Sequence, residues 1–228
     1  MHNDTNSSIS LWSTRVTIPI LIVYLFLILP GKNIYFQTSP WVLNYIDTIY
    51  YLVIIFFAVY KLNLKILGFS TKHFKNNLIM GVLSGGGVLF SLFILNFSID
   101  LVGLADNALF TERPILKNTI PIESIKEYSI IIIIVPLIEQ VFFTGIIFQS
   151  IEKKISPILA IYSAGVIYTL AKYKLNLGAF FLGALTSFLF KQTKTIFAPI
   201  IFHASCATGG VLIKNTFPRL KTLLGFLF

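Results

Sequence analysis

One ionisable residue lies in the middle of a long apolar stretch. Residues 130–151 are mostly apolar, begin with five consecutive isoleucines and contain a single acid, Glu139. A stretch of about 20 apolar residues is long enough to cross the hydrocarbon core of a bilayer as a helix. A carboxylate at mid-span is costly unless it faces a partner or a water-filled cavity. Glu139 is therefore the first candidate for a functional site.

The composition predicts an integral membrane protein. Hydrophobic residues make up 56% of the chain and charged residues 12%, whereas an ordinary soluble domain has about 25% charged residues. The 228 residues leave room for seven or eight helices of about 20 residues each. We predict an all-α fold, a polytopic transmembrane helix bundle of seven or eight helices. Residues 1–228 would then form one multi-pass domain in the cell membrane.

The positive charges follow the pattern of membrane proteins. The net charge is +9, but the basic residues lie mostly in short loops between apolar runs, as in cytoplasmic loops. This distribution favours the lipid bilayer over nucleic acid as the partner of the chain. The segment Lys61–Lys75 contains no acid and is predicted to be cytoplasmic, while the mixed-charge segment Asp100–Glu127 is predicted to be outside. The single Cys206 excludes an intrachain disulfide.

Seven apolar segments are expected to form the bundle. The first ends at Pro30-Gly31, a pair typical of a helix end, and Gly85–Gly87 in the third are expected to form a packing notch against another helix. The tail from Pro218 is too short to cross the membrane unaided, so it either lies in the interface as a basic amphipathic piece or extends an eighth helix that begins near Gly209. The seven segments cover residues 18–29, 45–60, 77–97, 128–151, 157–171, 175–190 and 196–213.

Three short motifs within residues 136–211 resemble those of a known family. They read EQVFFTG at 139–145, YTLAK at 168–172 and APIIFHA at 198–204. The motifs resemble those of the CPBP family, the membrane-embedded CAAX prenyl protease and bacteriocin-processing proteins, also called Abi proteins. The family pattern is Glu-Glu-x-x-x-Arg, then Phe-x-x-x-His, then His-x-x-x-Asn or His-x-x-x-Asp. In active members, the resemblance implies, the first glutamate and the second-motif histidine activate a water molecule.

Two of the six polar motif positions match the family and four depart from it. Glu139 and His203 stand where the family has its first glutamate and the histidine of its third motif. The departures are Gln140 for glutamate, Thr144 for arginine, Lys172 for histidine and Ala207 for asparagine. The resemblance therefore implies a degenerate protease centre in which Glu139 and His203 are residual or vestigial catalytic residues.

The departures are physically consistent with one another. Gln140 and Thr144 are four residues apart on one helical face, so a neutral pair that can hydrogen-bond replaces an ion pair without leaving either charge alone. Lys172 either pairs with Glu139 or extends to the membrane edge. Pairing would hold Glu139 ionised and occupied, and so make it a weaker proton acceptor. His203 is expected to be a packed, hydrogen-bonded histidine.

These observations favour binding over hydrolysis. The resemblance implies regulation of, or protection against, another membrane protein or peptide, such as a sensor kinase or a bacteriocin. The alternative is an active intramembrane CAAX-type endopeptidase that uses Glu139 and His203. Proton or ion handling by Glu139, and a subunit of a two-component enzyme, are further alternatives. A transporter would show internal repeats, and the glycine-rich segment has no counterpart in the second half of the chain.

No cofactor or metal is expected. Glu139 and His203 supply only two good ligands, whereas a catalytic zinc usually has three from the protein. The oligomeric state is not indicated by the sequence.

Overall fold

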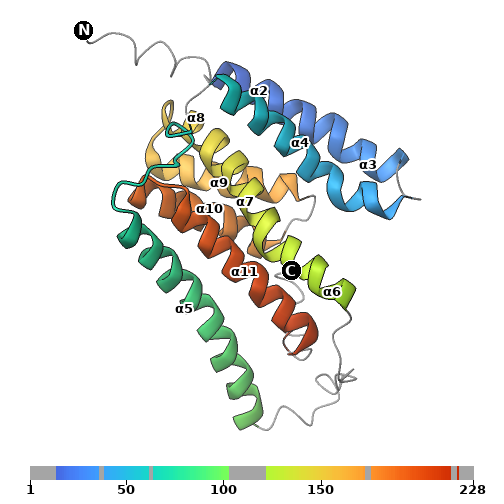
Figure 1. Cartoon of the computed structure of the whole chain (residues 1–228), viewed down its shortest axis with the longest axis vertical. Coiled ribbons are helices and arrows are strands. Elements are labelled where there is room, and N and C mark those ends of the chain that lie inside the picture. The colour runs from blue at the N-terminus through green and yellow to red at the C-terminus, as the bar shows by residue number, and fades with distance from the viewer. Residues whose placement is uncertain are drawn as a thin grey trace.

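The computed structural model describes residues 14–35, 39–61, 64–102, 122–172, 176–216 and 220. These residues form seven consecutive helical segments and contain no strand (Figure 1), which confirms the predicted all-α bundle. In chain order, the segments are α2 (Thr14–Val23), η1 (Tyr24–Ile28) and α3 (Leu29–Tyr35); α4 (Pro40–Lys61); α5 (Phe74–Leu101); α6 (Ile122–Ser129), η4 (Ile130–Ile134), α7 (Val135–Gln140), η5 (Val141–Phe148) and α8 (Gln149–Glu152); α9 (Pro157–Ala171); α10 (Leu177–Thr193); and α11 (Phe197–Asn215).

The surface of the bundle is suited to lipid. Large apolar side chains point outward along several helices, among them Phe26 on η1, Phe56 on α4 and Phe90 on α5. Helices satisfy their own backbone hydrogen bonds, which the bilayer interior requires. The chain is thus a multi-pass membrane protein embedded in lipid. Within the part of the chain that the structure describes, four stretches can cross the membrane by length and composition, namely Arg15–Lys32, Phe74–Leu101, Lys126–Glu152 and Phe197–Asn215. Tyr45–Tyr60 and Pro157–Ala171 are shorter apolar helices.

Parts of two sequence predictions lie outside the described residues. The structure does not describe residues 103–121 of the segment Asp100–Glu127. In the tail after residue 217 it describes only Leu220. The choice between seven and eight spans therefore stays a prediction, but a new helix does not begin near Gly209, because α11 continues through it to Asn215.

The expected helix end at Pro30-Gly31 is wrong. The first helical segment continues through these residues to Tyr35, and the turn before the proline is π-helical, with the Leu29 N–H bonded to the Tyr24 carbonyl. The ring of a proline inside an α-helix clashes with the carbonyl group four residues before it. For Pro30 that residue is Phe26, which lies within the wider π-helical turn. The helix therefore passes the proline without breaking.

The same arrangement precedes Pro136 in the central helical segment. There, η4 is π-helical and the Val135 N–H bonds to the Ile130 carbonyl. Local widening of the turn before a proline thus keeps the whole run from Ile122 to Glu152 helical.

Helices α9 and α10 begin at clear sequence signals. Ser156 caps α9 by accepting the Leu159 N–H at 3.5 Å, and Pro157 occupies the first helical position, where a proline lacks only an N–H that would have no helical partner. Asn176 caps α10 by accepting the Ala179 N–H at 2.7 Å. These caps fix where both helices enter the bundle.

A glycine contact joins α5 to α11, and the two helices run side by side (Figure 1). A Cβ on Gly81 would lie 3.0 Å from the Ala198 Cα, and one on Gly85 would collide with the Ser205 side chain. A Cβ on Gly86 or Gly87 would meet nothing within 4 Å. Gly81 and Gly85, four residues apart, therefore form the close helix contact that was expected at Gly85–Gly87.

The central segment carries the core of the molecule. Every residue of η5 is buried, and α7 and η5 contact α4, α9, α10 and α11. Aromatic rings line this contact: Phe142 stacks on Tyr51 at 4.4 Å between ring centroids, and Phe143 meets Tyr168 edge-on at 4.9 Å. The packing holds Glu139, at the junction of these helices, inside the bundle.

Candidate functional site

Both carboxylate oxygens of Glu139 are engaged. Glu139 lies on α7 and is 3% exposed. The Lys172 Nζ donates to Oε1 and forms an ion pair with it, and the Tyr168 hydroxyl donates to Oε2 at 2.5 Å. Lys172 thus turns inward to the carboxylate, which was one of the two positions considered for it. Two donors from α9 and the turn that follows it therefore hold one carboxylate from α7.

Neighbouring helices position these donors. Tyr168 and Lys172 are four residues apart, so they project from the same face. On one side, α10 packs closely against α9 at Gly183, where an added Cβ would lie only 2.6 Å from the Tyr168 Cβ. On the other side, the Tyr24 hydroxyl of η1 donates to the Ala171 carbonyl at 3.0 Å. The end of α9 is thereby held between two helices, which aims both side chains at Glu139.

His203 reaches the same site from α11. It is buried, and its Nε2 lies 3.9 Å from the Glu139 Oε2 and 3.4 Å from the Tyr168 hydroxyl oxygen. The structure thus brings Glu139, Lys172 and His203 together. The Tyr168 hydroxyl makes the shorter contact with each of Glu139 and His203, so it couples the two residues that match the family pattern.

Gln140 and Thr144 form the expected neutral pair and extend it to His203. The Thr144 hydroxyl donates to the Gln140 Oε1 at 2.6 Å, and the Gln140 Nε2 lies 2.9 Å from the His203 Nδ1. Both side chains are buried. A carboxamide oxygen can only accept and its nitrogen can only donate, so the His203 Nδ1 is the acceptor.

This hydrogen bond decides the tautomer of His203. A neutral imidazole whose Nδ1 accepts carries its proton on Nε2. That proton points toward the Tyr168 oxygen and the side of Glu139. The chain of hydrogen bonds then runs from Thr144 through Gln140, His203 and Tyr168 to the carboxylate.

The donors around Glu139 and His203 stabilise an ionised carboxylate and a neutral imidazole. The lone pair of His203 is used by Gln140, and each oxygen of Glu139 already accepts from a donor. Ala207, one turn after His203 on α11, adds no polar side-chain atom. A general base must be able to accept a proton from the reacting group, and each acceptor atom of the two matching residues already has one donor.

Tyr168 is the site residue that sequence reasoning missed. It occupies the phenylalanine position of the family's Phe-x-x-x-His motif, where the family pattern has no polar side chain. The sequence contained a signal for this role, because a tyrosine four residues before Lys172 places a hydroxyl on the same helical face as the lysine. Its target became visible only with α7 and α11 in place.

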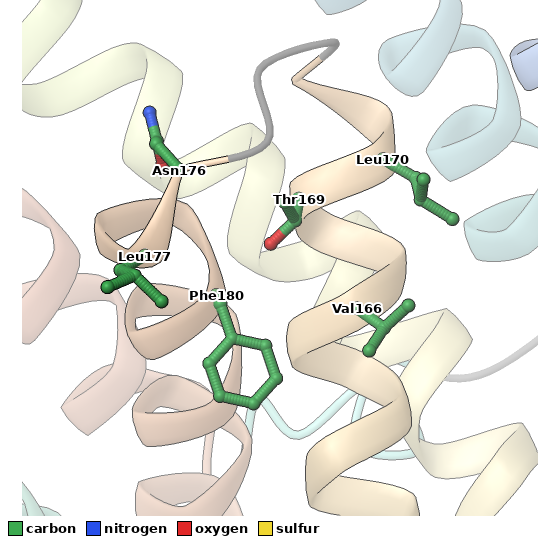
Figure 2. A pocket seen from close by; sticks show the side chains of 6 residues that line it. All are labelled: Val166, Thr169, Leu170, Asn176, Leu177 and Phe180. Atoms are coloured by element: carbon green, nitrogen blue, oxygen red, sulfur yellow. The ribbon is translucent and has the colours of Figure 1, made fainter. Parts of the chain in front are cut away.

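An apolar recess lies beside the site but does not include it. It has a volume of about 300 Å³ between the second half of α9 and the start of α10. Figure 2 shows its lining side chains, which are Val166, Thr169, Leu170, Asn176, Leu177 and Phe180. None of these belongs to the Glu139 network. Over the described ranges, no three His, Cys, Asp or Glu side chains are grouped so that they could hold a metal ion.

Comparison with known proteins identifies the region that contains the site. Residues 121–209 match the family model described as type II CAAX prenyl endopeptidase Rce1-like. All three motifs fall within this range, so the match confirms the resemblance to CAAX-protease-type membrane proteins. No curated protein and no solved structure matches the chain significantly.

Proposed function

We propose that this chain is a CPBP-type membrane protein that has lost peptidase activity and acts by binding another membrane component. The observation that carries the proposal is the state of Glu139. Its carboxylate pairs with Lys172 and accepts the Tyr168 hydroxyl, so its ionised form is already satisfied. A carboxylate in this position serves to connect α7 to α9.

The residue at position 140 supports the loss of activity. The family pattern has a glutamate there, and a carboxylate would accept from the His203 Nδ1 and leave the Nε2 lone pair facing Glu139. Gln140 donates to Nδ1 instead, which places a proton on Nε2. One change from acid to amide thus removes the imidazole lone pair from the side where a water would have to be deprotonated.

The partner class follows from the resemblance. The resemblance to the CPBP family implies a role in bacteriocin immunity or in regulation. A protein that has lost peptidase activity still has a membrane-embedded surface with which it can bind a partner. We therefore propose a regulatory or immunity function exerted on another membrane protein or on a membrane-active peptide.

Active endopeptidase is the second candidate, and one observation favours it. Glu139 and His203, the two matching family residues, lie 3.9 Å apart between Oε2 and Nε2. In this alternative, Lys172 and Tyr168 must release the carboxylate so that a water can bind between the two side chains. Hydrolysis would then depend on Glu139 as the base.

A cleavage assay separates the two functions. The purified chain in detergent is incubated with a prenylated CAAX peptide, and release of the C-terminal tripeptide is followed by mass spectrometry beside an active member of the family. We expect no cleavage above background by the unchanged chain or by Glu139→Gln. Glu152→Gln is the matched control, because Glu152 is also paired with a lysine but lies at the end of the same helical run. Cleavage by the unchanged chain and by Glu152→Gln, but not by Glu139→Gln, would establish the endopeptidase.

The cellular role is tested with the same variants. Where deletion of the chain gives a measurable phenotype, such as sensitivity to a membrane-active peptide, Glu139→Gln and His203→Ala should complement the deletion if both fold. Loss of complementation by a folded Glu139→Gln variant would contradict the proposal.

A further inference from the structure

Exposed lysines from three separate connections gather at one end of the bundle. They come from the stretch between α4 and α5, the turn between α8 and α9, and the turn between α10 and α11. We call them the lysine rim: Lys65, Lys72, Lys75, Lys153, Lys154 and Lys194, all exposed.

Backbone and side-chain contacts join the three connections. The Ile196 N–H donates to the Gly68 carbonyl at 3.0 Å, and the Gln149 side chain donates to the Ile66 carbonyl at 3.0 Å. Figure 1 shows the stretch before α5 beside α8 and the start of α11. The rim is therefore one continuous end of the folded molecule, although its residues are far apart in the sequence.

The charge at this end is strongly positive. Within the described ranges, Glu152 is the only acid there, and it pairs with Lys191 and lies 3.7 Å from the Lys194 Nζ. The other described acids lie inside the bundle or toward its opposite end, as with Glu127 on α6 and Asp100 at the end of α5. The rim thus carries an excess of cations.

Apolar side chains at the same level place the rim at the membrane surface. Leu64, Phe74 and Ile155 are exposed large hydrophobic residues, and each is adjacent in sequence to a rim lysine or one residue removed from it. Basic residues interleaved with exposed apolar ones are typical of segments at the level of the lipid headgroups. The lysines therefore lie where phosphate groups are present.

We propose that the lysine rim binds the phosphate groups of anionic phospholipids in the leaflet on its side. The rim is spread around the ends of several lipid-facing helices, which suits a shell of individual lipids. Lysine near a membrane surface attracts anionic headgroups, with about a fivefold gain in association for each lysine in contact. The attraction falls as salt screens it. This inference does not depend on the peptidase question.

Spin-labelled lipids test the proposal. The full chain is reconstituted in phosphatidylcholine vesicles with a trace of spin-labelled phosphatidylglycerol or phosphatidylcholine, and the motionally restricted fraction of each is measured. We expect a severalfold preference for phosphatidylglycerol, lost in the variant Lys72→Gln, Lys75→Gln, Lys153→Gln, Lys154→Gln. The matched control, Lys126→Gln with Lys214→Gln, removes two exposed lysines at the other end and should retain the preference.

Each result decides the question. An equal preference in the rim variant and the unchanged chain, or no preference in the unchanged chain, would overturn the proposal. Retention of a soluble acidic peptide by the rim, with no lipid preference, would instead assign the rim to a protein partner. Should the rim variant fail to reconstitute, the unchanged chain still decides, because a preference that persists at high salt would not come from the lysines.

Discussion

Two glutamate–lysine pairs lie on the same helical run and have different surroundings. Glu139 pairs with Lys172 in the middle of the bundle, with side-chain exposures of 5% and 35%, and Glu152 pairs with Lys191 at the end of the run, with 17% and 32%. The second oxygen of Glu139 accepts a hydrogen bond from the neutral hydroxyl of Tyr168. Glu152 has a second lysine, Lys194, at 3.7 Å.

The difference shows what burial requires of a charge. Inside the bundle, one cation balances one carboxylate and the remaining contacts are neutral donors, because uncompensated charge is expensive there. At the end of the helical run, two lysines around one acid leave an excess positive charge, which water and headgroups can screen. The inner pair therefore acts as a structural link, and the outer pair belongs to a charged surface.

The largest effect is expected from breaking the inner pair on one side. Lys172→Met keeps most of the side-chain stem but leaves Glu139 without its cation. Removing one partner of a buried pair typically costs about 3–5 kcal/mol, and because Lys172 is partly exposed and Tyr168 remains, we expect about 2–3 kcal/mol of lost stability. Unfolding of the detergent-solubilised protein, followed by circular dichroism, measures it.

The double variant provides the control for that experiment. Glu139→Gln with Lys172→Met removes both charges and should be clearly more stable than Lys172→Met alone. Additive effects, with a coupling energy below about 0.5 kcal/mol, would show that the two residues act independently. Glu139 would then be available for another role.

Removal of the Tyr168 hydroxyl should have the next largest effect. Tyr168→Phe deletes the donor to the Glu139 Oε2, and a hydrogen bond to a charged group contributes about 1.5–3 kcal/mol. Tyr162→Phe is the matched control, because Tyr162 is on the same helix and exposed. Equal melting temperatures for the two variants would mean that the hydroxyl adds nothing to the site.

A smaller change in stability but a specific spectroscopic one is expected from Thr144→Val. The substitution removes the donor that orients the Gln140 amide, at a cost of about 1 kcal/mol. We expect ¹⁵N spectra of labelled histidine to show His203 protonated at Nε2 in the unchanged chain and a mixture of tautomers in the variant. Protonation at Nδ1 in the unchanged chain would contradict the proposed hydrogen-bond chain.

The smallest effect is expected at the outer pair. Lys191→Met leaves Lys194 beside Glu152, and partly exposed pairs add little to stability. Its melting temperature should differ from that of the unchanged chain by less than that of Thr144→Val, and raising the salt concentration should reduce the difference further. A loss as large as that of Lys172→Met would remove the distinction between the two pairs.

Several features followed directly from local sequence. The apolar segments predicted the helices, and α9 has the predicted bounds, Pro157–Ala171. Its start could be predicted because its cap and its proline act within the first turn. Glu139 was identified as a site residue because a lone acid at mid-span needs a partner. The pairing of Gln140 with Thr144 also depended only on helical spacing.

Other features depended on contacts between distant segments. The choice of Gly81 with Gly85 as the notch and the role of Tyr168 both arise where one helix meets another. Spacing along a helix determines which side chains share a face, so the sequence alone is enough to predict it. Which donor meets which acceptor across that face is decided by how closely the helices pack, so only the tertiary structure placed Tyr168 between Glu139 and His203.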